Sequence, residues 1–284
     1  MTTWLVPHLE RPSFSGMAPH HGAPVFPTLW KACHAAWCPS LGPQGVLLDV
    51  CTGINRGTLM EGACYSRDGK GGLTVEFHGS NNYVDVGTAA YLDIFGANQD
   101  FSIACWAKFD DFGQFGGFFA SGSSASNGIW FGHDNSGASP SYLRFLSRSN
   151  TVSEDSSANL TAGSWVHVSV TCDRDGDLVM YQNGVAVHTA SISSTSGENW
   201  NRQNDVYKLG TDRSGNSHID GHLDDWRLYS RVLTPREVWI LSGFGGNESI
   251  GRGIAYRMHS MVAVHEEAAV APTTQSHLTL LGVA

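Results

Sequence analysis

The sequence predicts an all-β protein, a two-sheet antiparallel β-sandwich with an extended arm at each end. Between about Leu29 and Leu241, short runs of Val, Ile, Phe, Trp and Tyr alternate with clusters of Gly, Ser, Asn and Asp. Only 15% of the 284 residues are charged and 33 are Gly, a turn-rich composition that suits sheets better than helix bundles. We therefore expect the sandwich at residues 29–242 and arms at 1–28 and 243–284.

The strands are predicted where β-branched and aromatic residues concentrate between turn signals. The expected segments are 73–77, 83–86, 101–107, 128–132, 142–146, 164–172, 177–182, 206–209 and 222–228. Asp175-Gly176 and Asn183-Gly184 predict hairpins with type I′ turns, because Asp or Asn before Gly tolerates positive φ. One short helix is expected at 234–241, with Thr234 as N-cap, Pro235 at the first helical position and Glu237 completing a capping box.

The two arms are predicted from composition. Five prolines within residues 1–28 prevent a stable helix and remove sheet donors. Residues 243–284 are rich in small residues, and their apolar residues follow neither the helical nor the strand period. If ordered, such segments dock on other chains through apolar anchors; the alternative is two disordered tails. The chosen anchors are Trp4, Phe14, Phe26, Tyr256 and Leu280.

Charge and hydropathy exclude some partners. A net charge of −9 without any Lys/Arg cluster argues against nucleic acid as a partner. No apolar run approaches the length of a membrane span. Residues 1–8 lack a charged region followed by an apolar stretch, so no signal peptide is expected, and the six cysteines are read as thiols of a reducing compartment.

Five segments in order resemble laminin-G-like domains of the concanavalin A-like superfamily. The resemblance covers an opening strand at 35–39 with the loop 48–59, then the strands 101–106 and 165–171, then 180–184, and a closing segment at 221–237. Cys51 and Thr52 depart from the usual residues of the opening loop. The resemblance implies a concanavalin A-like jelly roll, a fold that serves lectins, adhesion modules and some glycanases.

The domain between a Pro-rich arm and the segment Arg252–Tyr256 is also similar to laminin-G-containing proteins of tailed bacteriophages. This similarity implies a non-enzymatic virion structural or accessory protein, for capsid decoration or associated with a tail or fibre. Its arms would fasten it to other virion proteins or to copies of itself, and its loops would contact surface glycans. A stand-alone lectin or adhesion module is the alternative. A hydrolase is the third reading, and the carboxylate motif E-x-D-x-x-E of the superfamily's glucanases is absent.

A polar loop with a tryptophan is the candidate glycan site. Trp200 is expected to be exposed and to stack on a sugar ring while neighbouring side chains bind hydroxyls. The alternatives are that Trp200 folds back over the sheet or anchors a neighbouring subunit. The candidate residues are Trp200, Asn199, Asn201, Arg202 and Tyr142.

Three patterns suggest metals, each with a plainer alternative. A structural Ca²⁺ at Asp49 and Asp224 is implied by the resemblance, and the alternative is that both carboxylates accept backbone N–H bonds. Strand alternation would place His218, Asp220, His222 and Asp224 on one face as a Zn or Mn set, or as a solvated polar edge. Four cysteines (Cys33, Cys38, Cys51 and Cys64) would form a Zn knuckle or serve as small buried apolar side chains, as Cys105 and Cys172 are expected to do.

Overall fold

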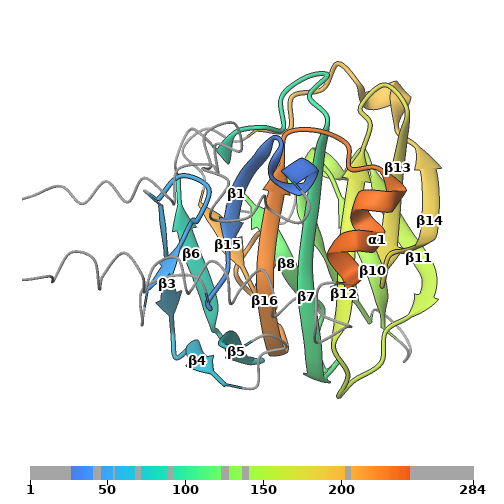
Figure 1. Cartoon of the computed structure of the whole chain (residues 1–284). Coiled ribbons are helices and arrows are strands. Elements are labelled where there is room, and N and C mark those ends of the chain that lie inside the picture. The colour runs from blue at the N-terminus through green and yellow to red at the C-terminus, as the bar shows by residue number, and fades with distance from the viewer. Residues whose placement is uncertain are drawn as a thin grey trace, which may run out of the picture.

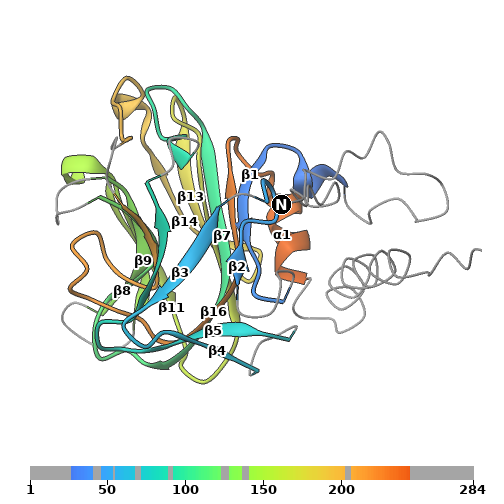
Figure 2. The same ribbon diagram turned by 90° about the vertical axis from the view of Figure 1, so that its left-hand side faces the viewer.

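The computed structural model describes residues 27–40, 46–53, 55–67, 72–88, 92–122, 128–135, 141–201 and 206–243. They form two antiparallel sheets packed face to face, as Figures 1 and 2 show. The predicted sandwich is confirmed. No helix in this part of the chain is both long and apolar enough to cross a bilayer.

The first sheet has the order β14-β13-β12-β7-β16-β5-β4, and β1 also pairs with β16. Its strands are β1 (Cys33–Trp37), β4 (Cys64–Ser66), β5 (Thr74–His78), β7 (Phe101–Asp111), β12 (Val166–Cys172), β13 (Asp177–Gln182), β14 (Val185–Ser191) and β16 (Asp220–Tyr229). The strand β16 bulges between Asp224 and Arg227. It pairs with β5 along its first half and with β1 along its second.

The second sheet has the order β11-β10-β9-β8-β15-β6-β3-β2. Its strands are β2 (Leu47–Leu48), β3 (Arg56–Met60), β6 (Tyr83–Gly87), β8 (Gly116–Ser121), β9 (Trp130–Asp134), β10 (Tyr142–Leu146), β11 (Ser153–Asn159) and β15 (Tyr207–Leu209). Short 3-10 turns occur at η2 (Pro27–Trp30), η4 (Arg148–Asn150) and η5 (Ser193–Thr195).

The main core lies between the sheets. Alternation along β7 points Phe101, Ile103, Cys105, Ala107 and Phe109 inward, where they meet the inner side chains of the second sheet. A second, smaller cluster lies on the outer face of the first sheet, beneath η2 and the helix α1 (Pro235–Gly243). The first sheet is therefore apolar on part of both faces.

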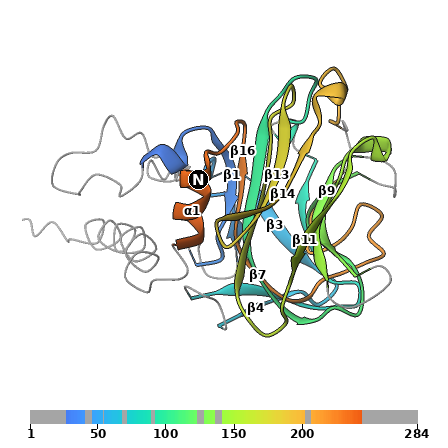
Figure 3. The same cartoon turned by 90° about the vertical axis from the view of Figure 1, so that its right-hand side faces the viewer.

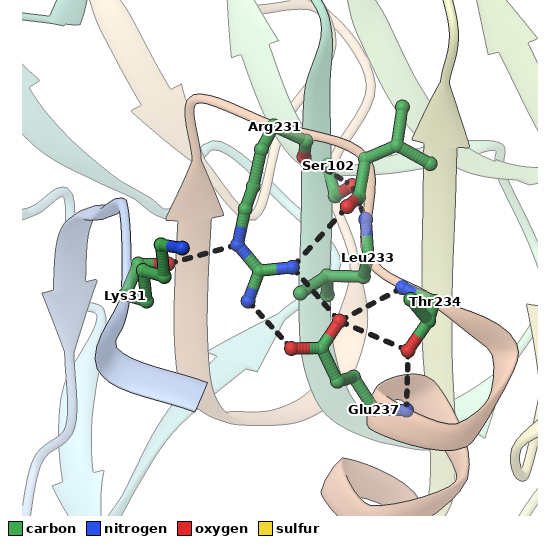
Figure 4. A network of polar contacts seen from close by, with 7 residues as sticks. Lys31, Ser102, Arg231, Leu233, Thr234 and Glu237 are labelled. Atoms are coloured by element: carbon green, nitrogen blue, oxygen red, sulfur yellow. Dashed lines mark hydrogen bonds and ion pairs between the residues drawn. The ribbon is translucent and has the colours of Figure 1, made fainter. Parts of the chain in front are cut away.

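The predicted capping box of α1 is confirmed. Thr234 N donates to Glu237 Oε2 (2.9 Å), and Glu237 N donates to Thr234 Oγ1 (3.3 Å). Arg231 forms a two-point ion pair with the same carboxylate and donates from Nε to the carbonyl of Lys31, as Figure 4 shows. Arg231 thus ties α1 to the segment before β1, and these bonds lower the pKa of Glu237, although its partial burial opposes them.

Both predicted hairpins are present, since β13 pairs with β12 and with β14, but only one of them has the predicted type I′ turn. Asn183 and Gly184 have φ of 51° and 79°, as a type I′ turn requires. Neither Asp175 nor Gly176 has a positive φ. Four residues (173–176) join β12 to β13, and Gly176 N donates to the carbonyl of Asp173 (3.1 Å), so this loop is built on an ordinary turn.

Candidate functional site

The outer face of the second sheet, beside β9, β10 and β11, collects polar and aromatic side chains. Alternation points Phe131 and Phe145 into the core. The side chains between them in β9 and β10 face outward, and the register places Tyr142 opposite Asp134 and Arg144 opposite Gly132. We call this surface the β9–β11 face; it consists of Trp130, Gly132, Asp134, Tyr142, Arg144 and Asp155, with Phe115 at its margin.

An arginine held between two carboxylates occupies the centre of the β9–β11 face. Arg144 binds Asp134 through Nη1, and its Nε lies 3.1 Å from Asp155 Oδ1. The side chain of Asp134 is 6% exposed, whereas those of Arg144 and Asp155 are 25% and 44% exposed. Burial raises the pKa of Asp155, although Arg144 acts in the opposite direction. The buried carboxylate fixes the guanidinium, whose Nη2 donates to Ser153 Oγ (3.3 Å).

A tryptophan lies flat beside this charge network because two neighbouring positions are glycine. A Cβ on Gly117 would lie 2.5 Å from Trp130 Nε1, and one on Gly132 would lie 2.5 Å from Trp130 Cζ2. Phe115, which is 38% exposed, meets the indole edge-on with 6.0 Å between ring centroids. The two glycines therefore make room for the indole, which is only 3% exposed, so Phe115 is the more accessible of the two rings.

The connection between β15 and β16 borders the face. In Figures 2 and 3 this orange segment runs outside β8 and β9, and a Cβ on Gly117 would lie 2.1 Å from the Thr211 carbonyl oxygen. Arg213 fastens it by donating to the Ser147 carbonyl (3.0 Å) and to Asn150 Oδ1 (2.9 Å). Burial lowers the pKa of Arg213 to about 10, and it remains charged at neutral pH. The β15–β16 connection thus forms one border of the β9–β11 face and is held in place by the buried Arg213.

This combination suits a polar ligand with an apolar side, such as a sugar. Aromatic rings accept the C–H face of a pyranose or furanose, while a guanidinium and carboxylates bind its hydroxyls. Of the predicted glycan residues, Tyr142 lies on this face and is half-buried.

The prediction that Trp200 is exposed is wrong. Trp200 is 0% exposed and packs against Phe101 and Phe145, with ring centroids 6.3 and 6.1 Å apart. The guanidinium carbon of Arg174 lies 3.4 Å from the centroid of its ring, and Nε1 donates to Glu198 Oε2 (3.1 Å). A large indole gains more by closing the end of the core than by facing water, so the predicted alternative, a tryptophan folded back, is what occurs.

The amides beside Trp200 hold the loop in place. Asn201 Oδ1 accepts from Phe95 N (2.7 Å), and Asn201 Nδ2 donates to the carbonyl of Asp93 (3.2 Å). Asn199 is exposed, and its Oδ1 accepts from Asn201 N (2.9 Å). Arg202 lies outside the described residues, as do the arm anchors Trp4, Phe14, Phe26, Tyr256 and Leu280.

The two carboxylates predicted to bind calcium have protein donors. Asp49 is buried and accepts from Ala36 N (2.8 Å), Cys51 N (2.9 Å) and Thr52 Oγ1 (2.6 Å). Asp224 accepts from Asp225 N (2.7 Å), and burial raises its pKa to about 8. Within the described ranges, no three His, Cys, Asp or Glu side chains gather to hold a metal. The calcium requirement itself stays a prediction.

Of the four side chains predicted to share one face of a strand, three lie in β16 and the fourth, His218, lies before it. Asp220, His222 and Asp224 lie in the strand at alternate positions. His218 precedes it, pairs with Thr211 on the side of the second sheet and places Nδ1 2.9 Å from the Asn82 carbonyl. His218 and His222 are 4% and 5% exposed, so the alternative of solvated histidines is also wrong.

The cysteines are free thiols in various environments. Cys33, Cys51, Cys105 and Cys172 are buried as expected, whereas Cys38 is half-buried and Cys64 is exposed. Cys33 and Cys51 touch, with sulfurs 3.3 Å apart. The four cysteines of the predicted knuckle do not form a metal-holding group in the part of the chain that is described.

Sequence reasoning missed Asp134, Arg144, Asp155 and Trp130 as members of one face. A signal was present, because alternation in the predicted strand 142–146 places Tyr142 and Arg144 on the same side. The partners from β9 and β11 follow only from the pairing register.

Two antiparallel sheets packed face to face make this chain a β-sandwich domain, and the β9–β11 face is its candidate site. The family model of the concanavalin A-like lectin/glucanases superfamily, Laminin_G_3, matches residues 78–239. The chain belongs to this family.

Solved structures with little sequence identity share the fold. Domain 4 of AbnA, a GH43 extracellular arabinanase from Geobacillus stearothermophilus, in complex with arabinotriose, is 19% identical (TM-score 0.54), and the match covers 74% of this chain and 97% of that one. The binding domain of Paraclostridial Mosquitocidal Protein 1 is 17% identical (TM-score 0.58), with 75% and 52% covered. The binding domain of botulinum neurotoxin serotype G is 15% identical (TM-score 0.53), with 74% and 50% covered. The chain thus spans about half of each toxin binding domain.

Proposed function

We propose that this chain is a non-catalytic carbohydrate-binding domain and that its ligand lies on the β9–β11 face. The observation that supports this most is Arg144, whose side chain is 25% exposed and is held by a buried carboxylate on the same face as Tyr142 and Phe115. Groups held in place before binding lose little conformational freedom when a ligand arrives. The fold family supports the same class of function, because it includes lectins.

The similar structures suggest the first ligand to try. The arabinanase domain was solved with arabinotriose. Arabino-oligosaccharides are therefore suitable first probes, followed by a broad glycan array. The absence of an E-x-D-x-x-E motif favours binding over hydrolysis.

The test compares two tyrosines on the same sheet. Tyr142→Ala should weaken glycan binding about fivefold, since losing one aromatic contact costs about 1 kcal/mol. Tyr83→Ala is the matched control, because Tyr83 is also a half-buried tyrosine on the outer side, in β6. Calorimetry on the full chain measures both. If the wild type binds no glycan of the array, or both variants bind as it does, the β9–β11 face is not a carbohydrate site.

The proposal extends to where the domain is displayed. We propose that the chain is a virion structural or accessory protein, assembled in a host cytoplasm, whose arms attach it to other virion proteins or to copies of itself. The basis is the composition of residues 1–28 and 243–284 and the similarity to phage proteins. Deleting both arms should abolish incorporation into particles while glycan binding persists. Unchanged incorporation would favour the alternative, a stand-alone lectin or adhesion module.

A structural calcium, bound through Asp49 and Asp224, also belongs to the proposal. Its test is the melting temperature of the full chain in calcium and in EGTA. An unchanged melting temperature would remove calcium from the proposal and leave glycan binding as it stands.

A further inference from the structure

Two buried thiols from different segments meet on the outer side of the first sheet. Cys33 begins β1, and Cys51 follows β2, 18 positions later in the chain. Their sulfurs lie 3.3 Å apart, and the two side chains are 0% and 2% exposed. To reach a disulfide bond length of about 2.05 Å, these sulfurs would need to approach by only about 1.3 Å.

The backbone around the two thiols already holds these segments together. Val50 N donates to the Ala36 carbonyl (2.8 Å), and Asp49 pairs with Trp37 as an isolated bridge. Asp49 Oδ1 accepts from both Ala36 N and Cys51 N. The approach of the two cysteines is therefore a consequence of backbone pairing and a buried carboxylate.

Three of the other described cysteines, Cys64, Cys105 and Cys172, lack such an arrangement. Cys105 and Cys172 lie in neighbouring strands, but Cys172 pairs with Phe101, four residues from Cys105. Four residues along a strand span about 13 Å, too far for a disulfide. Cys64 is exposed and opposite Glu76, without a neighbouring thiol in the register.

We propose that Cys33 and Cys51 form a disulfide when the chain meets an oxidant of the low-molecular-weight disulfide class, such as oxidised glutathione. One protein thiolate attacks a glutathione sulfur, which releases one reduced glutathione and leaves a mixed disulfide. The second protein thiolate then attacks the protein sulfur of that mixed disulfide and releases the second glutathione. Two electrons pass from the protein to the reagent, and the two thiol protons end on the two glutathiones.

The environment makes this reaction slow in the folded state. Both cysteines are buried, at 0% and 2% exposed, so a dissolved disulfide does not reach their sulfurs while the fold is closed. Closure therefore takes place while the chain folds, or after η2 and its neighbours open locally. Once formed, the bond is shielded from thiols in solution by the same burial.

The test uses the full chain carrying Cys64→Ser, which removes the exposed thiol. One sample is incubated folded with oxidised glutathione at pH 8, and another is refolded from urea in a glutathione buffer. We expect a mass lower by two hydrogen atoms, a linked peptide containing Cys33 and Cys51, and a melting temperature raised by roughly 5–10 °C and restored by reductant. Adding Cys33→Ser or Cys51→Ser should abolish all three changes.

Two outcomes would overturn the proposal. One is the absence of the linked peptide from both the folded and the refolded sample. The other is a linked peptide that joins a different pair of cysteines, or a mass loss that persists when Cys33 and Cys51 are both serine.

Discussion

Replacing Trp200 by alanine tests whether this residue belongs to the core or to a binding surface. The indole is 0% exposed, and Trp→Ala changes in cores cost about 3–5 kcal/mol through lost burial and the cavity left behind. The structure adds two further losses. Arg174 lies 3.4 Å above the ring, a buried cation–π contact worth about 2 kcal/mol, and the bond from Nε1 to Glu198 is worth about 1 kcal/mol.

These losses do not add fully, because all three involve the same side chain and its neighbours. We expect Trp200→Ala to lower the free energy of unfolding by about 5 kcal/mol, a large share of the roughly 5–15 kcal/mol of a typical domain. Trp200→Phe keeps an aromatic face under Arg174 and should cost roughly half as much. Urea unfolding followed by far-ultraviolet circular dichroism measures both without relying on tryptophan fluorescence.

Trp239 provides the matched control. It lies on α1 and is 64% exposed, so Trp239→Ala should change the free energy of unfolding by less than about 1 kcal/mol. If Trp200→Ala unfolds at the same urea concentration as the wild type and loses glycan binding, Trp200 is a ligand contact and our account of this loop is refuted.

Three further predictions concern polar groups. Glu237→Ala removes the cap of α1 and the ion pair with Arg231 and should cost about 2–3 kcal/mol in urea unfolding, most of which Glu237→Gln should restore; equal losses for the two variants would contradict the cap. Burial raises the folded pKa of Asp224 to about 8, above an unfolded value near 4, so its protonated form is favoured by folding. Its contribution to stability is therefore complete below about pH 4 and lost as pH rises to about 8. Asp224→Asn should make the melting temperature depend less on pH between pH 5 and 8.5. If the melting temperature of the variant varies with pH as that of the wild type does, another group is responsible. Asp49→Ala should cost about 3 kcal/mol in EGTA, because three donors lose their acceptor, and more in calcium, which the wild type is proposed to bind through Asp49; equal losses in the two buffers would contradict the calcium site.

Local patterns identified many of the elements correctly. The strands 142–146 and 177–182 match β10 and β13, and the capping box of Thr234 and Glu237 is present. These features depend on residues within a few positions of one another, which is why the sequence suffices. Strands β8 and β11 were missed for a related reason. Strand β8 begins with two glycines, and β11 has the polar sequence SEDSSAN. Neither has the apolar alternation that marks a strand.

The sequence by itself determined the alternation, the turns and the class of fold. The tertiary structure alone decided which way Trp200 faces, that Asp134 and Asp155 meet Arg144, and that Cys33 touches Cys51. A side chain in a Gly- and Asn-rich loop is exposed or buried according to what packs over it, and here Arg174 and Phe101 do so. The physical reason is that such contacts depend on strand register and on burial shared between distant segments, neither of which a local pattern specifies.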